Sequence, residues 1–122
     1  FSRIDQTIAL GALFTAHHLN ANAIAALTES GSTAVWMSRH NIHLPIFALT
    51  SKIATQRALS TYRNVFPIGL DYTKQRDAAL QEVEDCLKKL GAVKKGDVVV
   101  LTSGEPMGEP GGTNSLKIIQ VK

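Results

Sequence analysis

The segment from Leu27 to Thr33 (LTESGST) places four hydroxyl side chains and one glycine within seven residues. It follows the apolar run 23–28 (AIAALT), which predicts a strand, and it leads into residues 33–40, which we expect to form a helix. A helix N-terminus offers unpaired N–H groups and a dipole that favours negative charge. Ligands of open α/β sheets also bind at the carboxyl ends of the strands. The pattern predicts a phosphate site made by Thr28, Ser30, Gly31, Ser32 and Thr33.

Two features of this segment leave its interpretation open. Ser32 or Thr33 could simply cap the helix, although capping requires one hydroxyl and four are present. Glu29 is unfavourable for an anion, because a carboxylate about 5 Å from a phosphate charge costs about 3 kcal/mol at an effective dielectric of about 20. Either Glu29 points away from the ligand, or the ligand carries less charge than a bisphosphate.

A second candidate segment runs from Thr102 to Asn114 (TSGEPMGEPGGTN) and also follows a predicted strand. It is rich in glycine, but it has neither the Gly-Lys-Ser/Thr end of a P-loop nor a GxGxxG motif that enters a helix. If the first and fourth strands are neighbours, the two segments converge on one crevice. The candidate residues in this second loop are Ser103, Gly104, Gly108, Gly111, Gly112 and Thr113.

Residues for catalysis or metal binding are scarce, and we predict no catalytic residue and no metal site. His40 and His43 are three residues apart near a helix end, but no third ligand accompanies them. His17 and His18 are adjacent on a helix and therefore face different directions. Cys86 lies on the apolar side of its predicted helix, which favours an inert thiol over a nucleophile.

The composition indicates one domain with its own core. The chain has 122 residues, of which 44% are hydrophobic and 19% charged. A single cysteine suits a reducing cytoplasm, and we expect a cytoplasmic protein. No apolar run approaches the length of a membrane span, and no signal peptide is apparent. The net charge of +3 does not imply nucleic-acid binding, because the lysines near residues 88–95 flank a helix end without interleaved aromatics. The start at Phe1 suggests a processed fragment.

Helical and strand patterns alternate along the chain, which is typical of an α/β sheet. Continuous apolar strands such as DVVVLT indicate a parallel sheet with helices on both faces. Too little chain separates the last two strands for a helical crossover, so we expect the last strand to be an antiparallel edge strand, with Lys117 and Lys122 protecting the edge. Gly91 stands at an expected helix C-cap. The expected helices cover residues 4–20, 33–40, 52–63 and 74–90, and the expected strands cover 23–28, 45–50, 65–70, 97–102 and 115–121.

The first helix has no charged residue between Thr7 and Ala16. We expect one side of it to carry Ile4, Ile8, Ala12, Thr15 and Leu19. A helix that is apolar all round needs cover on more than one side. This favours a partner subunit or a neighbouring domain over burial beneath its own loops.

Several long segments of this chain resemble the C-terminal domain of bacterial pyruvate kinases. They are IDQTIALGALFTA, then AIAALTESGSTAVWMSRHNIHLPIFALTSKIATQRALSTYRNVFPI, and then KKGDVVVLTSGEPMGEPGGTN. The resemblance covers essentially the whole chain, and the order of LTESGSTA, PIFALT, RNVFPI and GDVVVLTSG is specific. It implies a three-layer α/β/α sandwich around a five-stranded mixed sheet of order 3-2-1-4-5, with strand 5 antiparallel.

The resemblance also implies a function for the parent enzyme. A pyruvate kinase transfers a phosphoryl group between phosphoenolpyruvate and ADP with Mg²⁺ and often K⁺. Its catalytic groups belong to a (β/α)₈ barrel that this chain lacks, so we expect the domain alone to be inactive and to hold no cofactor. The corresponding family domain binds phosphorylated effectors and helps to build a tetramer. We therefore expect three partners: an effector, the barrel domain, and a second copy of the chain through the first helix and the last strand.

By position, the family's phosphate loop falls on Thr28, Ser30, Gly31, Ser32 and Thr33, and its effector loop falls on residues 103–113. Forms activated by fructose 1,6-bisphosphate often carry a cation where Glu29 stands, and basic or aromatic residues in the effector loop. The loop of this chain has Glu105 and Glu109 instead. We therefore expect glucose 6-phosphate, ribose 5-phosphate or AMP as the effector, in preference to fructose 1,6-bisphosphate.

Three other functions remain open at this point. The chain could be a stand-alone phosphosugar or nucleotide sensor of the same fold. It could be a small flavodoxin-like phosphotransferase or hydrolase that uses the 28–33 loop. It could also serve assembly alone and bind no ligand.

Overall fold

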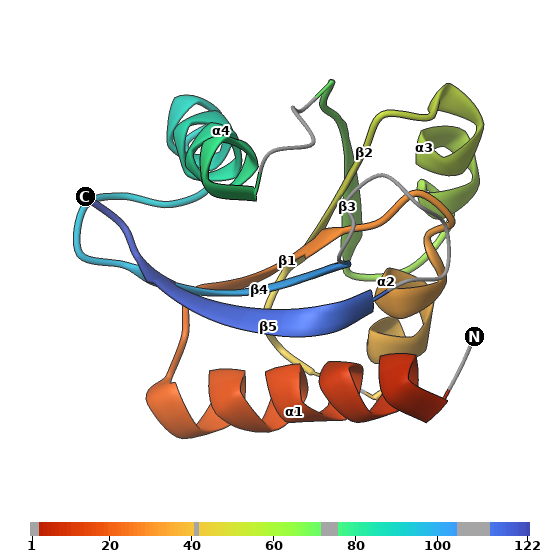
Figure 1. Cartoon of the computed structure of the whole chain (residues 1–122), viewed down its shortest axis with the longest axis horizontal. Helices are drawn as coiled ribbons and strands as arrows, with labels where there is room; N and C mark the ends of the chain where they lie inside the picture. Colours follow the sequence, from red (N-terminus) through yellow and green to blue (C-terminus); the bar gives the residue numbers. More distant parts are fainter. Residues whose placement is uncertain (1–2, 41, 72–75, 105–112) are drawn as a thin grey trace.

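The sheet lies between α1 on one side and α4 on the other in the computed structural model (Figure 1). The structure describes residues 3–40, 42–71, 76–104 and 113–122. Within these ranges, none of the helices has the length and apolar character that a bilayer crossing requires. In chain order the elements are α1 (Arg3–Leu19), β1 (Ala23–Leu27), α2 (Ser32–Ser38), β2 (Ile46–Thr50), α3 (Ile53–Leu59), β3 (Val65–Gly69), α4 (Arg76–Lys89), β4 (Val98–Gly104) and β5 (Thr113–Gln120).

The five strands form one sheet in the order β3-β2-β1-β4-β5. The β1–β2, β2–β3 and β1–β4 pairs are parallel, and the β4–β5 pair is antiparallel. The predicted fold class, strand order and antiparallel edge strand are therefore confirmed. Ala26 of β1 stands opposite Thr102 of β4, so these two strands end at the same level of the sheet.

Alternate residues along the central strands enter two separate cores. Ile24 and Ala26 of β1 pack with residues of α1, α2 and α3. Ala25 and Leu27 point to the other face and pack with residues of α4. Every residue of β1 is buried, as expected for a central parallel strand that helices cover on both faces.

The side of α1 that faces the sheet is made mainly of small residues. Asp5, Ala9, Ala12 and Ala16 face the core, whereas Ile4 is 63% exposed and Leu19 is 43% exposed. Of the five residues expected on one side, only Ala12 is buried. The small side chains of Ala9, Ala12 and Ala16 let the helix lie close to the sheet. A Cβ added to Gly11 would lie 3.7 Å from Leu116 of β5, which shows how closely the two elements approach.

The third helix is shorter than predicted. α3 ends at Leu59 rather than near residue 63. The Ser60 and Thr61 hydroxyls donate to the carbonyls of Arg57 and Ala58, which closes the last turn. Asn64 has a φ of 66° and donates its side-chain amide to the Ile42 and Leu44 carbonyls. These bonds fix the chain reversal that leads into β3.

The last two strands are longer than predicted, and the helix end at Gly91 is as expected. β4 continues to Gly104, and β5 begins at Thr113, because Gly104 and Thr113 still pair across the hairpin. Both ends of the predicted glycine-rich segment 102–114 therefore belong to strands, the first to β4 and the last to β5. Gly91 follows α4 with a φ of 76°, and its N–H donates to the Lys88 carbonyl, which confirms the C-cap.

Candidate functional site

The loop between β1 and α2 is a tight turn that its own side chains hold together. The Gly31 N–H donates to Thr28 Oγ1 at 2.8 Å. Gly31 has a φ of 83°, a conformation that other residues adopt at a cost of about 1–2 kcal/mol. A Cβ at Gly31 would also lie 3.0–3.3 Å from three atoms of the Leu59 side chain. Both the backbone and the packing therefore require glycine here.

The hydroxyls of this loop do not act as an ordinary helix cap. Gly31 is the N-cap residue of α2 and supplies no side-chain bond to the helix. Ser32 N–H donates to Ser30 Oγ at 3.3 Å, and Ser30 Oγ donates to Ser32 Oγ at 3.1 Å. Ser32 lies within the first turn of the helix, and Thr33 is bonded elsewhere. The simple capping interpretation of Ser32 and Thr33 is therefore wrong.

The two candidate loops meet through a pair of buried hydroxyls. Thr33 Oγ1 lies 2.9 Å from Thr113 Oγ1 across a sequence separation of 80 residues. Both side chains are at least nine-tenths buried. Because β1 and β4 are neighbours, their carboxyl ends also bring Thr28 and Ser103 to the same edge of the sheet. Ser103 and Gly104 lie on β4, while Gly108, Gly111 and Gly112 lie outside the described residues.

Thr102 is a further polar residue at this edge. Its side chain is 1% exposed, and its Oγ1 has no hydrogen-bond partner among the described residues. It stands opposite Ala26 at the end of β1. The sequence placed Thr102 in the glycine-rich segment but gave no reason to expect a buried hydroxyl.

The Glu29 carboxylate turns toward β2. Its Oε2 accepts a hydrogen bond from Ser51 Oγ at 2.7 Å, and its Oε1 accepts one from the Ser51 N–H at 3.3 Å. The Glu29 carbonyl accepts a bond from Thr55 Oγ1 at 2.6 Å. Glu29 is 5% exposed, so it joins the β1–α2 loop to the start of α3 as a buried, bonded side chain.

A hollow of about 470 Å³ lies beside Ser30, Gly31 and Ser32, between α1 and α2. Gln6, Val35, Trp36 and Arg39 complete its lining. The sequence analysis missed Gln6, Trp36 and Arg39. Helical spacing could have indicated Trp36 and Arg39, because residues 32, 36 and 39 lie on one face of a helix that begins at Ser32. Arg39, at the other end of α2 from Ser32, supplies a cation to the lining of this hollow.

The other candidate residues take structural positions. His40 Nδ1 lies 2.9 Å from the Trp36 carbonyl, and the two rings are 4.1 Å apart. Among the residues that the structure describes, no group of three or more His, Cys, Asp or Glu side chains could hold a metal ion. Burial raises the pKa of the Cys86 thiol, and the nearby Lys89 cation opposes this rise to a smaller extent. A raised thiol pKa makes the nucleophilic thiolate scarcer at neutral pH.

We predict that Gly31→Ala destabilises the fold more than Gly91→Ala does. Both glycines have positive φ, but a Cβ at Gly91 meets nothing within 4 Å, whereas one at Gly31 meets Leu59. The shared backbone cost is about 1–2 kcal/mol, and crowding adds roughly 1–3 kcal/mol at Gly31. Urea unfolding of both variants measures this difference. Equal losses would contradict the proposed tight contact between the loop and α3.

Comparison with known proteins gives consistent matches over almost the whole chain. The family model described as pyruvate kinase, alpha/beta domain, matches residues 6–119. A pyruvate kinase of Buchnera aphidicola subsp. Baizongia pistaciae is 40% identical over 122 residues, which cover 99% of this chain and 26% of the relative. Pyruvate kinase II of Salmonella typhimurium is 35% identical over 123 residues, which cover 100% of this chain and 26% of the relative.

A solved structure agrees with the fold. The crystal structure of a pyruvate kinase from Cryptosporidium parvum superposes with a TM-score of 0.86 at 24% identity, over 100% of this chain and 23% of that one. The chain spans about a quarter of the length of the curated relatives that it matches. On the family match and the identities together, this chain belongs to the pyruvate kinase family, in which it corresponds to the alpha/beta domain.

Proposed function

We propose that this chain is the regulatory and oligomerisation domain of a cytoplasmic pyruvate kinase and that it binds a phosphorylated effector. The parent enzyme would transfer the phosphoryl group of phosphoenolpyruvate to ADP on a barrel domain that uses Mg²⁺, and often K⁺ in this family. The domain alone would be inactive. The observation that carries the proposal is the Thr33–Thr113 contact, which joins the hydroxyl-rich loop to the strand that leaves the glycine-rich loop.

The loop 28–33 has the chemistry that a phosphate group requires. Ser30 is exposed, and its hydroxyl and that of Ser32 lie together at the edge of the hollow beside α2. Hydroxyl and backbone N–H donors at a helix start favour an anion. Arg39 lines the same hollow and offers a charge-assisted hydrogen bond.

The preference for an effector with one phosphate rests on the charge of Glu29 and on which side of the loop a second phosphate would lie. The Glu29 carboxylate points toward β2, where Ser51 holds it with two donors. The carboxylate is therefore held on the β2 side of the loop. A ligand with a second phosphate on this side meets electrostatic repulsion, whereas glucose 6-phosphate, ribose 5-phosphate or AMP presents a single phosphate to the serines.

Titration of the 122-residue chain tests the effector site. We expect saturable amide shifts at residues 28–33 on addition of glucose 6-phosphate, ribose 5-phosphate or AMP, and weaker binding of fructose 1,6-bisphosphate. Glu29→Gln keeps an oxygen acceptor for Ser51 but removes the charge. It should raise the affinity for the bisphosphate by about tenfold or more, because the repulsion removed is roughly 1.4–3 kcal/mol.

The matched control is Asp85→Asn, which removes one negative charge on α4, where Asp85 accepts a bond from Gln81. This variant should leave the preference between the ligands unchanged. Absence of shifts with all four ligands would refute effector binding by this loop. An unchanged preference in Glu29→Gln would refute only the role of Glu29.

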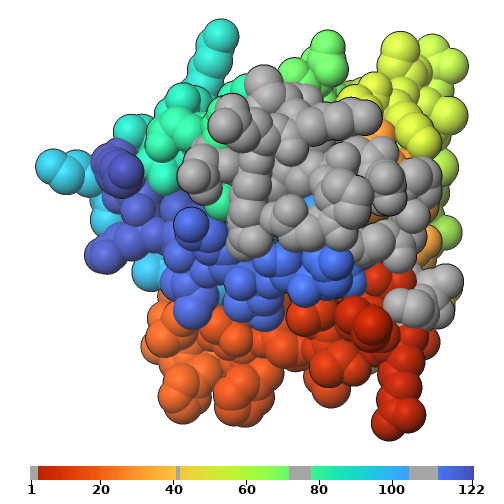
Figure 2. Space-filling view, viewed as in Figure 1, coloured from red at the N-terminus to blue at the C-terminus, as the bar shows by residue number. Residues whose placement is uncertain are grey.

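The exposed apolar side of α1 supports self-association. Ile4 is 63% exposed, Leu10 is 57% exposed and Phe14 is 68% exposed. On β5, Ile118 is 49% exposed, and α1 and β5 pack directly on one another through Gly11 and Leu116. Figure 2 shows α1 in red and orange and β5 in blue as adjoining parts of one surface. Large apolar side chains exposed on adjoining elements in this way are typical of a subunit contact.

We predict that Phe14→Asp weakens self-association by at least about tenfold, because aromatic residues near the centre of an interface contribute most of its stability. Sedimentation equilibrium measures the change, and circular dichroism checks the fold. Ile53→Asp on α3 is the control, since Ile53 is 65% exposed away from α1 and β5. A wild-type chain that stays monomeric at about 1 mM, which means an association free energy weaker than about 4 kcal/mol, would contradict the proposal.

A further inference from the structure

The dipeptide Leu-Thr occurs three times at or near the end of a strand, and two of these threonines use their hydroxyl to close a turn. After β1, the Gly31 N–H donates to Thr28 Oγ1 at 2.8 Å. After β2, the Lys52 N–H donates to Thr50 Oγ1 at 3.1 Å. Bonds of this kind are an ordinary structural use of threonine in a turn. The third threonine, Thr102, has a different environment.

The hydroxyl of Thr102 has no evident role in the fold. β4 runs on to Gly104, so the residues that follow Thr102 continue the ladder with β5 instead of forming a turn. Thr102 is 1% exposed, and its Oγ1 has no hydrogen-bond partner among the residues that the structure describes. A buried hydroxyl without a partner destabilises a fold, and valine has nearly the same shape without this disadvantage. A threonine here therefore needs an explanation beyond packing.

Thr102 lies on the side of the sheet that α1 and α2 cover. Val100, two residues earlier on β4, and Ala26, opposite Thr102 on β1, both pack in the core on this side. Thr33 belongs to α2, whose Ala34 packs in the same core. Figure 1 shows β1 and β4 as neighbouring strands, with α1 and α2 on one side of the sheet. The Thr102 and Thr33 side chains therefore belong to the same side, where β1 meets β4.

The contact between the two candidate loops lies one step further along β4. Gly104, two residues after Thr102, pairs with Thr113, and Thr113 Oγ1 lies 2.9 Å from Thr33 Oγ1. Two residues of a strand span roughly 6–7 Å. One water molecule that bonds on both sides can bridge buried polar groups at this spacing, and such a water needs two to four polar partners. The three threonine hydroxyls and a phosphate oxygen would supply them.

We propose that Thr102 is a positioning residue of the effector site, and that its hydroxyl bonds a buried water molecule which in turn bonds an oxygen of the effector phosphate. The inference rests on the proposed function, since it concerns the same phosphate that the loop 28–33 receives. Folding has already removed the Thr102 hydroxyl from water, so the new bond forms without a further desolvation cost. The bound effector thus gives a partner to a group that has none in the described part of the chain.

Thr102→Val removes the hydroxyl and keeps the shape of the side chain. In the 122-residue chain it should weaken glucose 6-phosphate binding by about three- to tenfold, as measured by calorimetry. Binding of inorganic phosphate should weaken by the same factor, because the lost interaction is with the phosphate group. The midpoint of urea unfolding should stay the same or rise, because the variant no longer buries an unpaired hydroxyl.

Two further variants separate this role from a structural one. Thr102→Ser keeps the hydroxyl but removes a buried methyl group, so it should bind like the wild type and unfold at a lower urea concentration. Thr50→Val is the matched control, because Thr50 is 0% exposed and its hydroxyl accepts the Lys52 N–H. This variant should lose stability and keep its affinity for glucose 6-phosphate.

Equal affinities of the wild type and Thr102→Val would overturn the role of Thr102 and leave the effector site standing. A loss seen with glucose 6-phosphate but not with inorganic phosphate would also overturn it, since the interaction would then be with the sugar. So would a clear loss of stability in Thr102→Val, because the hydroxyl would then bond within the fold. A wild-type chain that binds neither ligand would refute the effector site and the role of Thr102 together.

Discussion

The parallel pairing of β1 with β4 is the constraint on which the rest of the structure depends. β2 and β3 extend the sheet on one side of this pair, and β5 extends it on the other. β1 and β4 therefore end at the same edge of the sheet, at the point where the strand order reverses. The level ends of the strands, with Ala26 opposite Thr102, bring Thr33 within reach of Thr113. Any site made from both loops requires this one pairing.

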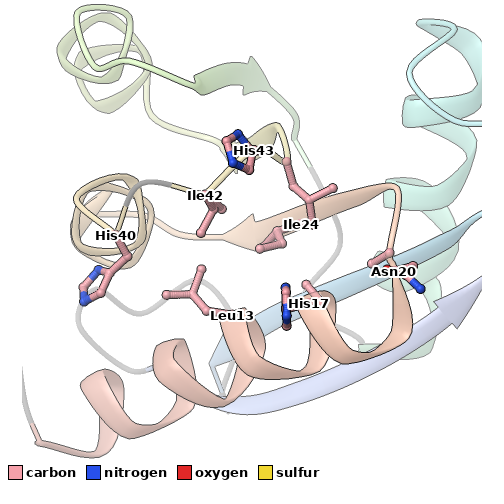
Figure 3. A pocket seen from close by; sticks show the side chains of 10 residues that line it. Leu13, His17, Asn20, Ile24, His40, Ile42 and His43 are labelled. Carbon is pink, nitrogen blue, oxygen red and sulfur yellow. The ribbon is translucent and has the colours of Figure 1, made fainter.

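Small side chains determine how the helices pack, and through that which surfaces stay exposed. Alanines 9, 12 and 16 allow α1 to approach the sheet, and the larger residues of that helix are left on its outer side. The outer side of the helix therefore exposes Leu10 and Phe14, and its C-terminal half forms one wall of a hollow that His17 lines (Figure 3).

The sequence alone predicts the helices and strands whose pattern lies within a few neighbouring residues. Apolar runs such as DVVVLT mark buried strands, and the short link between the last two strands indicates an antiparallel edge. The face of α1 could not be predicted, because large and small apolar residues form two competing stripes on an uncharged helix. The orientation of Glu29 depends on Ser51, 22 residues away, and the hollow beside Ser30 depends on the packing of Gln6 near α2. Such contacts follow from the fold and have no local pattern.

If the β1–β4 pairing creates function, the two loops must act as one site. A double-mutant cycle on Thr33→Val and Thr113→Val, with glucose 6-phosphate binding measured by calorimetry, tests this most directly. We predict that each single variant weakens glucose 6-phosphate binding severalfold. The double variant should lose little more binding than either single variant, because the two hydroxyls form one contact. The coupling energy between the two positions should then be about 0.5–3 kcal/mol. Strictly additive losses, or binding that neither change affects, would contradict a shared site.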